Sequence, residues 1–260
     1  MESNDQVELD IKKKNLDLSY GKKVHPWRIC PLGKHFVRIY TVHIPPSKRH
    51  PNGIVTTRHQ HCANNSSKKD ILFFDEIIAV GSKYFSILSG PPAAKVLTAE
   101  FPRADDYDQL IRGWVSYWND IFQEKEPLNP NLIKALIASE SSFDPNPKKI
   151  KGAHGLLQIQ DKTLHILSDY KGELKDHLVY LSSKDLLNPS ANICAGIRWL
   201  FRKKTTASAK LGHEATWEEA VIDYKGYWDS IKDVETSKGL INFRDFYNRL
   251  QEKNENKKTF

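Results

Sequence analysis

The stretch from Asn129 to Pro145 constrains the fold more than any other part of the sequence. Asn129-Pro130 has the form of a helix start, with an asparagine cap and a proline at the first helical position, where its missing N–H costs nothing. Glu140 then continues an apolar stripe of helical spacing, and the Ser-Ser-Phe-Asp-Pro sequence that follows predicts the end of the helix. The stripe consists of Leu132, Ile133, Leu136 and Ile137.

The place of Glu140 on this helix points to chemistry. A carboxyl group in line with a core-facing stripe is expected to be partly desolvated, whereas solvated glutamates belong on the opposite face. Partial desolvation raises the pKa of a carboxyl group, as a general acid that works near neutral pH requires. Glu140 is therefore the candidate catalytic residue. The alternative is a half-exposed glutamate near a helix end, which is the commoner case for a single glutamate.

Residues 106 to 250 are predicted to be almost wholly helical. A glycine-containing turn from Gly152 to Gln160 leads into one helix, and Asn188-Pro189 repeats the cap-plus-proline start for another. Thr216-Trp-Glu-Glu219 has the form of a capping box, and the helix that it opens is expected to stop at Gly226. The apolar stripes are Leu110, Ile111, Trp114, Val115, Trp118, Ile121 and Phe122; Ile193, Ile197, Leu200 and Phe201, with Cys194 as a small core residue; Trp217, Ala220, Val221 and Tyr224; and Phe243, Phe246, Tyr247 and Leu250.

The N-terminal part of the chain has a different sequence pattern. Alternation from Phe36 to Ile44 predicts a strand, and residues 54–57 predict a second strand that makes a hairpin with it. Residues 75–85 predict a helix, and the segment from Phe101 to Asp106 predicts a linker and helix start. The chain thus divides into a mobile arm (1–24), a small accessory α+β region of unknown role (25–100), a helical domain (106–250) and a polar tail (251–260).

Histidines and cysteines gather in the accessory region. Six of the ten histidines lie between residues 25 and 62. His59, His61 and Cys62 are candidate ligands for a structural Zn²⁺, with Cys30 or His35 completing a tetrahedral site. The spacing matches no standard zinc pattern, so ordinary histidines together with a Cys30–Cys62 disulfide stay open as the alternative.

Net charge and hydropathy limit the classes of partner that we expect for this protein. The net charge of +7 suggests an anionic partner such as a cell-wall polymer, a nucleic acid or a lipid surface. Nucleic acid ranks low because no basic region is interleaved with a DNA- or RNA-reading motif. The N-terminus has no apolar signal-peptide core, and no run of about eighteen apolar residues predicts a membrane span. We therefore expect either a cytoplasmic protein or export by a route without a cleaved signal.

Four motifs follow one another along the helical part of the chain. They are Glu140-Ser-Ser-Phe143-Asp-Pro145; Gly152-Ala-His-Gly155-Leu-Leu-Gln158-Ile with Thr163 close behind; Asn188-Pro189 with Asn192-Ile193, Gly196 and Trp199-Leu200; and Asp223-Tyr224-Lys225-Gly226. In this order, they resemble the soluble lytic transglycosylase domain. The resemblance covers residues 106 to 250 and implies a mainly α-helical, lysozyme-like fold preceded by the small α+β region. It also implies cleavage of the β-1,4 bond between N-acetylmuramic acid and N-acetylglucosamine in peptidoglycan.

By resemblance, Glu140 is the catalytic acid and base. Lys225 is a departure, because the family commonly has asparagine there, and it puts in doubt the hydrogen bond that this position supplies. Leucine in place of methionine at Leu157 conserves volume and is a neutral departure. The substrate-binding positions that the resemblance implies are Ser141, Gly155, Leu157, Gln158, Asn192 and Tyr224.

A single carboxyl group has to suffice for the chemistry, since most glycosidases use a pair. Asp144 suits a turn, and Asp161 and Asp223 are unsupported as second catalytic acids. By the family's route, Glu140 protonates the glycosidic oxygen and then takes the proton of the muramic C6 hydroxyl as that oxygen attacks C1. The product is a 1,6-anhydro end, no metal or cofactor is required, and attack by water would instead make the enzyme a hydrolytic muramidase.

Two alternatives to the enzyme interpretation stay open. The protein could be a non-catalytic peptidoglycan-binding or assembly protein with the same fold. Residues 25–100 could form a zinc or partner-binding module that delivers the enzyme, which does not exclude the enzymatic activity. Action in the periplasm or at the cell wall requires a specialised route, such as a secretion machine, a phage tail or holin-type release. A secretion machine, a phage tail and an immunity protein are accordingly the candidate partners.

Overall fold

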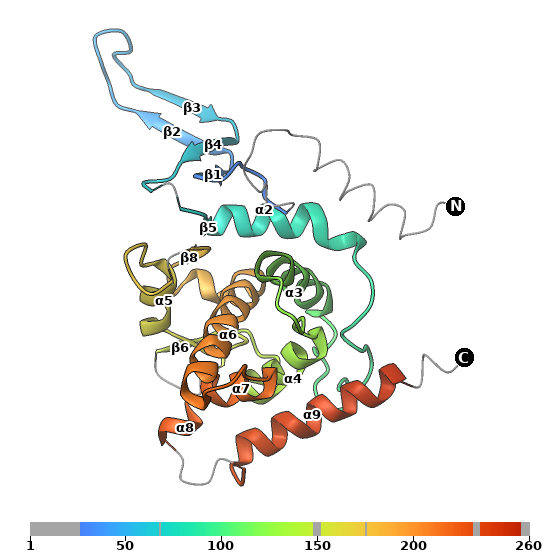
Figure 1. Cartoon of the computed structure of the whole chain (residues 1–260). Helices are drawn as coiled ribbons and strands as arrows, with labels where there is room; N and C mark the ends of the chain where they lie inside the picture. Colours follow the sequence, from blue (N-terminus) through green and yellow to red (C-terminus); the bar gives the residue numbers. More distant parts are fainter. Residues whose placement is uncertain (1–26, 68, 148–151, 175, 231–234, 256–260) are drawn as a thin grey trace.

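The computed structural model describes residues 27–255, except for residues 68, 148–151, 175 and 231–234. The predicted arm 1–24 and the last five residues of the predicted tail lie outside the described residues. Figure 1 shows a helical body with a narrow β-hairpin projecting from one end. None of the helices in the described ranges is both long enough and apolar enough to cross a membrane.

The helical body follows the predicted pattern closely. In α4, the Asn129 side chain accepts a hydrogen bond from the backbone N–H of Asn131, with Pro130 in the first turn. The predicted capping box is present at the start of α7, where Thr216 and Glu219 bond each other's backbone N–H. The helices are α3 (Asp108–Phe122), α4 (Pro130–Ser141), α5 (Asp161–Ser168), α6 (Pro189–Leu211), α7 (Trp217–Tyr224), α8 (Tyr227–Ser230) and α9 (Lys238–Glu255), with a short 3-10 turn η2 (Asp185–Leu187) before α6.

Helix α6 is the centre of the body, and it packs against α3 and α7 (Figure 1). Helix α9 lies across α4, where the Asn131 side chain donates to the Leu250 carbonyl at 3.1 Å. The stripe predicted for α3 faces the core, with Trp114 and Trp118 fully buried. Because α9 continues to Glu255, the polar tail predicted from residue 251 begins as helix, which corrects that boundary.

The accessory region predicted over residues 25–100 is not a separate unit along its whole length. Strand β5 (Ile71–Phe73) pairs in parallel with β8 (Leu178–Tyr180) of the helical body. Helix α2 (Phe74–Tyr84) and the 3-10 turn η1 (Phe85–Ile87) follow β5 and share one hydrophobic core with it. The Phe85 ring lies so close to Gly113 of α3 that a Cβ there would meet it at 2.2 Å. From Ile71 onward, the chain therefore belongs to the same core as the helical domain, and we correct the predicted boundary near residue 100.

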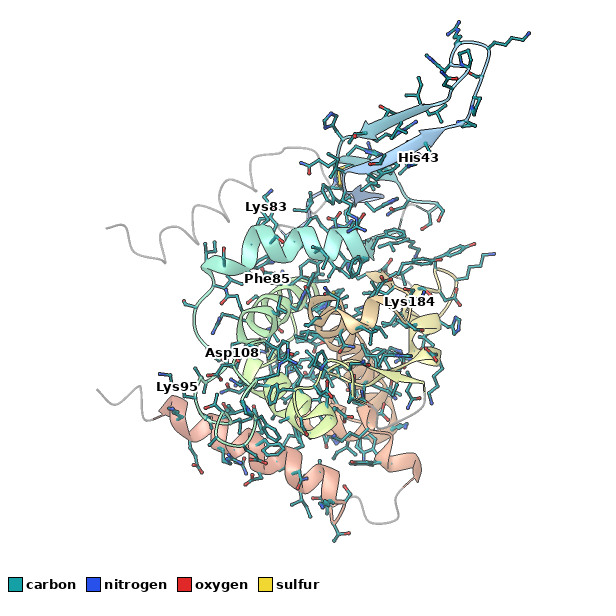
Figure 2. All side chains as sticks on the ribbon, turned by 180° about the vertical axis from the view of Figure 1, so that it is seen from behind. His43, Lys83, Phe85, Lys95, Asp108 and Lys184 are labelled. Carbon is teal, nitrogen blue, oxygen red and sulfur yellow. A yellow bond between two sulfur atoms is a disulfide. The ribbon has the colours of Figure 1, made fainter. Side chains whose placement is uncertain are left out.

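The remaining N-terminal residues form two antiparallel pairs, β1 (Lys34–Val37) with β4 (His61–Asn64), and β2 (Tyr40–Ile44) with β3 (Ile54–Arg58). The predicted hairpin is thus confirmed, but the predicted strand from Phe36 to Ile44 is broken after Val37 because its two halves pair with different partners. The β2–β3 pair projects into solvent, and His43 on it lies far from the helical body (Figures 1 and 2).

The base of this projection is firmly attached. The Cys30–Cys62 disulfide joins the chain before β1 to β4, and it is visible as a yellow bond in Figure 2. The fully buried carboxylate of Glu76 on α2 accepts hydrogen bonds from the backbone N–H groups of Ile29, at 2.9 Å, and Phe36, at 2.8 Å. The Arg28 guanidinium lies between two carboxylates, with Nε 3.2 Å from Glu76 Oε1 and Nη1 2.7 Å from Asp70 Oδ1. These contacts hold β1 and β4 against α2.

Candidate active site

Glu140 lies in the last turn of α4, where the sequence placed it. The helix ends because Ser142 and Phe143 both take left-handed backbone conformations, with φ values of 54° and 62°. Phe143 is fully buried and anchors the chain after the helix. The Glu140 side chain is 16% exposed, so its carboxylate is largely but not completely withdrawn from water.

The partner of this carboxylate is Lys225, which directly follows α7. The Lys225 ammonium is 2.5 Å from Glu140 Oε1 and donates to Ser139 Oγ at 3.0 Å. Its side chain is only 4% exposed and its ammonium lies 6.0 Å from the centroid of the Tyr227 ring. The ends of α4 and α7 are therefore joined by an ion pair. Sequence reasoning identified Lys225 as a departure from the family pattern but did not foresee this contact, and it missed Ser139.

The glycine turn is built around Asn192. Gly155 has a φ of +69°, and a Cβ there would meet the Asn192 side chain at 2.1 Å and the Leu186 carbonyl at 2.4 Å, so only glycine fits. Asn192 is fully buried; its Oδ1 accepts from the Leu157 N–H at 2.8 Å and its Nδ2 donates to the His154 carbonyl at 2.9 Å. Short strands β6 (Ala153–His154) and β7 (Ile159–Gln160) close the turn.

Two residues predicted to bind substrate form hydrogen bonds within the protein. All the hydrogen bonds given for the Asn192 amide run to backbone groups of the turn and of η2, so Asn192 shapes the turn from within. Ser141 is 1% exposed, and its hydroxyl donates to the Ile137 carbonyl one helical turn back at 3.2 Å. These hydrogen bonds give both side chains a structural role next to Glu140 and in the glycine turn. The substrate-binding role that the resemblance implies for them stays a prediction.

Tyr224 connects α7 to the glycine turn. Its hydroxyl donates to the Leu157 carbonyl at 2.7 Å. Burial is the first cause that raises the pKa of Tyr224 well above its usual value, and the negative charge of Glu140 is the second. The phenol is thus neutral throughout the physiological range. Glu140, Leu157 and Tyr224 are therefore brought together from three separate segments, as the sequence predicts.

Gln158 supplies an unused acceptor beside this group. Its Nε2 donates to the Gly155 carbonyl at 2.8 Å, and its backbone is held in the left-handed region with φ of 47°. Its Oε1 is buried and has no hydrogen-bond partner within the part of the chain that the structure describes. A buried carbonyl oxygen without a partner is costly, and a sugar hydroxyl or N–H is a fitting donor for it.

The other acidic candidates are engaged elsewhere. Asp144 accepts from the Asn146 N–H at 2.9 Å, which is the turn role expected of it. Asp161 accepts from His154 and Ser183, each at 2.8 Å. Asp223 is buried and pairs with Lys203 and Lys210 of α6, at 3.1 Å and 2.8 Å. None of the three shares an ion pair or hydrogen bond with Glu140 in the described contacts.

The bonding of Cys30 and Cys62 distinguishes the zinc hypothesis from the disulfide alternative. Cys30 and Cys62 are bonded to each other, so the disulfide that the sequence left open is the arrangement found. His61 Nδ1 lies 2.9 Å from the His59 carbonyl. Among the described residues, no group of three or more His, Cys, Asp and Glu side chains is placed to hold a metal ion.

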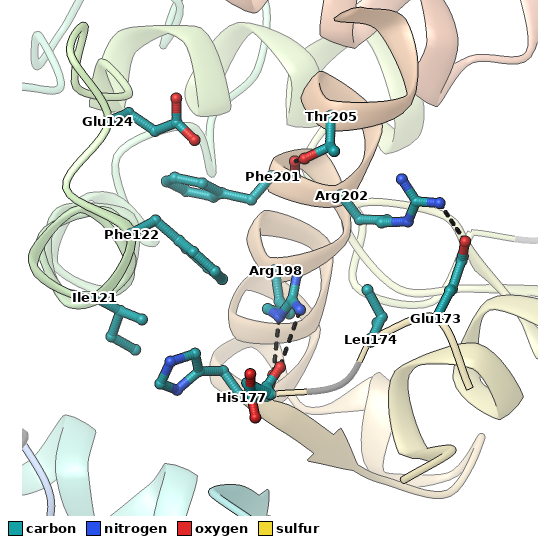
Figure 3. A pocket seen from close by; sticks show the side chains of 11 residues that line it. Ile121, Phe122, Glu124, Glu173, Leu174, His177, Arg198, Phe201, Arg202 and Thr205 are labelled. Atoms are coloured by element: carbon teal, nitrogen blue, oxygen red, sulfur yellow. Dashed lines mark hydrogen bonds and ion pairs between the residues drawn. The ribbon is translucent and has the colours of Figure 1, made fainter. Parts of the chain in front are cut away.

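A cavity of about 530 Å³ lies between α3 and α6, away from Glu140 (Figure 3). Arg198 lines it and donates to the carbonyls of His177, at 2.8 Å, and Asp176, at 3.2 Å. Burial, followed by the nearby charge of Arg202, lowers the pKa of Arg198 to about 10. Because Arg198 ties the segment before β8 to α6, we assign it to the framework and not to the Glu140 site.

Comparison with known proteins identifies the helical region. Residues 117–235 match the family model described as "Transglycosylase SLT domain". Searches of curated proteins and of solved structures returned no match to the chain. The matched range contains Glu140, the glycine turn, Tyr224 and Lys225, and the helical architecture agrees with the lysozyme-like fold that the resemblance implied. Residues 117–235 of this chain are therefore similar to the transglycosylase SLT domain family, and this similarity supports a protein that acts on peptidoglycan.

Proposed function

We propose that this protein is a peptidoglycan lytic transglycosylase that cleaves the β-1,4 bond between N-acetylmuramic acid and N-acetylglucosamine with Glu140 alone. The observation that carries the proposal is the set of carboxylates. Of the four candidate carboxylates in the described part of the chain, Glu140 lies beside the glycine turn and Tyr224 in a largely buried position, while Asp144, Asp161 and Asp223 are held by other partners. A mechanism with one carboxyl group accounts for this arrangement better than one with a pair.

The chemistry needs Glu140 to act twice. As the neutral acid, it donates its proton to the glycosidic oxygen while the bond from that oxygen to C1 breaks. The acetamido oxygen of the substrate stabilises the positive charge that develops at C1. The resulting Glu140 carboxylate then takes the proton of the muramic C6 hydroxyl as its oxygen bonds to C1, which closes the 1,6-anhydro ring and restores the neutral acid.

Lys225 contacts the carboxyl group that has to transfer the proton in this mechanism. Its ammonium lies 2.5 Å from Glu140 Oε1. The glycosidic oxygen therefore has to approach the other carboxyl oxygen of Glu140, or glycan binding has to displace Lys225 and open the pair. The long, unbranched side chain of lysine allows this change without movement of α7.

The neighbouring polar groups position the sugar. The unpaired Oε1 of Gln158 accepts a hydrogen bond from a sugar N–H or hydroxyl, and the Tyr224 ring closes the site on the α7 side. Because these groups come from the rigid turn around Asn192 and from a helix end, they are fixed before the substrate arrives.

The test is lysis of purified sacculi by the wild-type protein and by Glu140→Gln. The substitution conserves shape but cannot transfer a proton, so turbidity clearing should fall at least about a hundredfold while the thermal unfolding curve keeps its cooperativity. Mass spectrometry of the wild-type products should show 1,6-anhydro muropeptides. Reducing ends alone would establish a hydrolytic muramidase, and no clearing by the folded wild-type protein would establish a non-catalytic peptidoglycan-binding protein.

Its place of action follows from the substrate. We propose that the protein works in the periplasm or at the cell wall and reaches it through a specialised secretion or lysis route. Detection of the native protein in periplasmic and secreted fractions, with a cytoplasmic marker as the control, tests this placement.

A further inference from the structure

The positive charge of the chain is concentrated in one segment. Residues 34–69 hold seven lysines and arginines and no aspartate or glutamate, so their formal charge of +7 equals that of the whole chain. The remaining lysines and arginines number 32, as do all the aspartates and glutamates, so the rest of the molecule is balanced. Five of the seven cations, Lys34, Arg38, Lys48, Arg49 and Arg58, lie on or between β1 to β4, at the projecting end seen in Figure 1.

The outer part of the segment, which we call the cationic hairpin (residues 38–58), also exposes aliphatic side chains. Ile39 is 56% exposed, Ile44 is 39% exposed and Val55 is 64% exposed. The register places Ile44 opposite Ile54 and Val55 opposite His43, so apolar side chains occur on both faces of the ribbon close to its tip. The tip itself carries the exposed cations Lys48 and Arg49.

This combination restricts the partner. Moving exposed aliphatic side chains out of water is favourable only when they enter an apolar environment. A soluble glycan or phosphate polymer does not provide such an environment. Nucleic acids are bound through their phosphates and, when single-stranded, through stacking on aromatic rings, and neither contact uses exposed aliphatic side chains. A protein with an acidic patch would cover one face of the ribbon and leave the aliphatic side chains of the other face in water.

We propose that the cationic hairpin binds the surface of an anionic phospholipid bilayer. The tip cations lie among the lipid phosphates, while Ile44, Ile54 and Val55 enter the boundary between headgroups and acyl chains on both sides of the ribbon. The disulfide and the Glu76 hydrogen bonds hold the base of the hairpin, so the arm is presented to the membrane already formed. This proposal goes beyond the proposed lytic activity, which uses Glu140 in the helical body.

The experiment is co-sedimentation of the full-length protein with vesicles of phosphatidylcholine, with and without phosphatidylglycerol. Wild type should bind the anionic vesicles and leave the neutral ones almost unbound. Each cation near an anionic surface contributes about fivefold to partitioning, so Lys48→Gln with Arg49→Gln should weaken binding about 25-fold. Ile44→Ser with Val55→Ser should weaken it about tenfold or more by removing apolar contacts.

A matched control removes two exposed lysines of the helical body, Lys83→Gln with Lys184→Gln, whose positions appear in Figure 2. It should bind as wild type does, and all three double variants should digest solubilised glycan strands at the wild-type rate. Equal binding to both vesicle types, or none to either, would overturn the proposal. Sensitivity to the tip cations without sensitivity to Ile44 and Val55 would overturn it in favour of a soluble anionic polymer.

Discussion

Lys225 offers the sharpest test of how the site is held together. We consider Lys225→Met, which keeps the length of the side chain and removes its charge. Removing one member of a fully buried ion pair costs about 3–5 kcal/mol. Because the Glu140 side chain is still 16% exposed, water replaces part of the lost partner, and we expect a loss of about 1–3 kcal/mol in the free energy of unfolding.

A double-mutant cycle with Glu140→Gln separates this pair from other effects of the substitution. Urea unfolding of both single variants and of the double variant at pH 7 should give a coupling energy of about 1–3 kcal/mol. The matched control is Lys210→Met, which removes a lysine from the Asp223 pair and should show almost no coupling to Glu140→Gln. A Lys225–Glu140 coupling below about 0.5 kcal/mol would refute the reasoning.

Three further predictions follow from the framework. Replacing Cys30 and Cys62 by serine opens a bridge between residues 32 apart in sequence; we expect a loss of about 4 kcal/mol on urea unfolding, and an unchanged midpoint would contradict it. Burial raises the pKa of Asp108 from 3.8 to about 6, so between these pH values the folded protein keeps a proton on Asp108 that the unfolded chain has released. The protonated side chain contributes about 3 kcal/mol to the free energy of unfolding at low pH, and this contribution is lost as pH rises from 4 to 7. Asp108→Asn should therefore gain stability relative to wild type over that range, and parallel curves of unfolding free energy against pH would refute this expectation. Gly155→Ala should cost more than about 2 kcal/mol and most of the activity, because the new methyl group would meet Asn192 at 2.1 Å; a wild-type melting temperature would show that the turn adapts.

Local signals explain what the sequence predicted well. The cap and proline at the start of α4, the capping box of α7 and the apolar stripe of α3 are interactions within a few residues, so they can be read directly from the chain. The position of Glu140 at the end of a buried stripe is another such signal.

Long-range contacts explain what it did not predict. The β5–β8 pair joins two three-residue strands from distant parts of the chain, and such short strands leave almost no periodic pattern. The direction of the Lys225 side chain depends on how α7 packs beside α4. The inward role of Asn192 becomes visible only once the turn and η2 surround it.

The β5–β8 pair also sets the smallest piece of this protein that can fold independently. A fragment cut at the limits of the family match, 117–235, loses the strand that pairs with β8, and it begins within α3, so the packed rings of Phe85 and Trp114 are lost as well. It also loses α9, and with it the cover over α4. During synthesis, β5 and α2 emerge from the ribosome long before their partners, so the nascent chain carries unshielded apolar surface until residue 200 or so has been added.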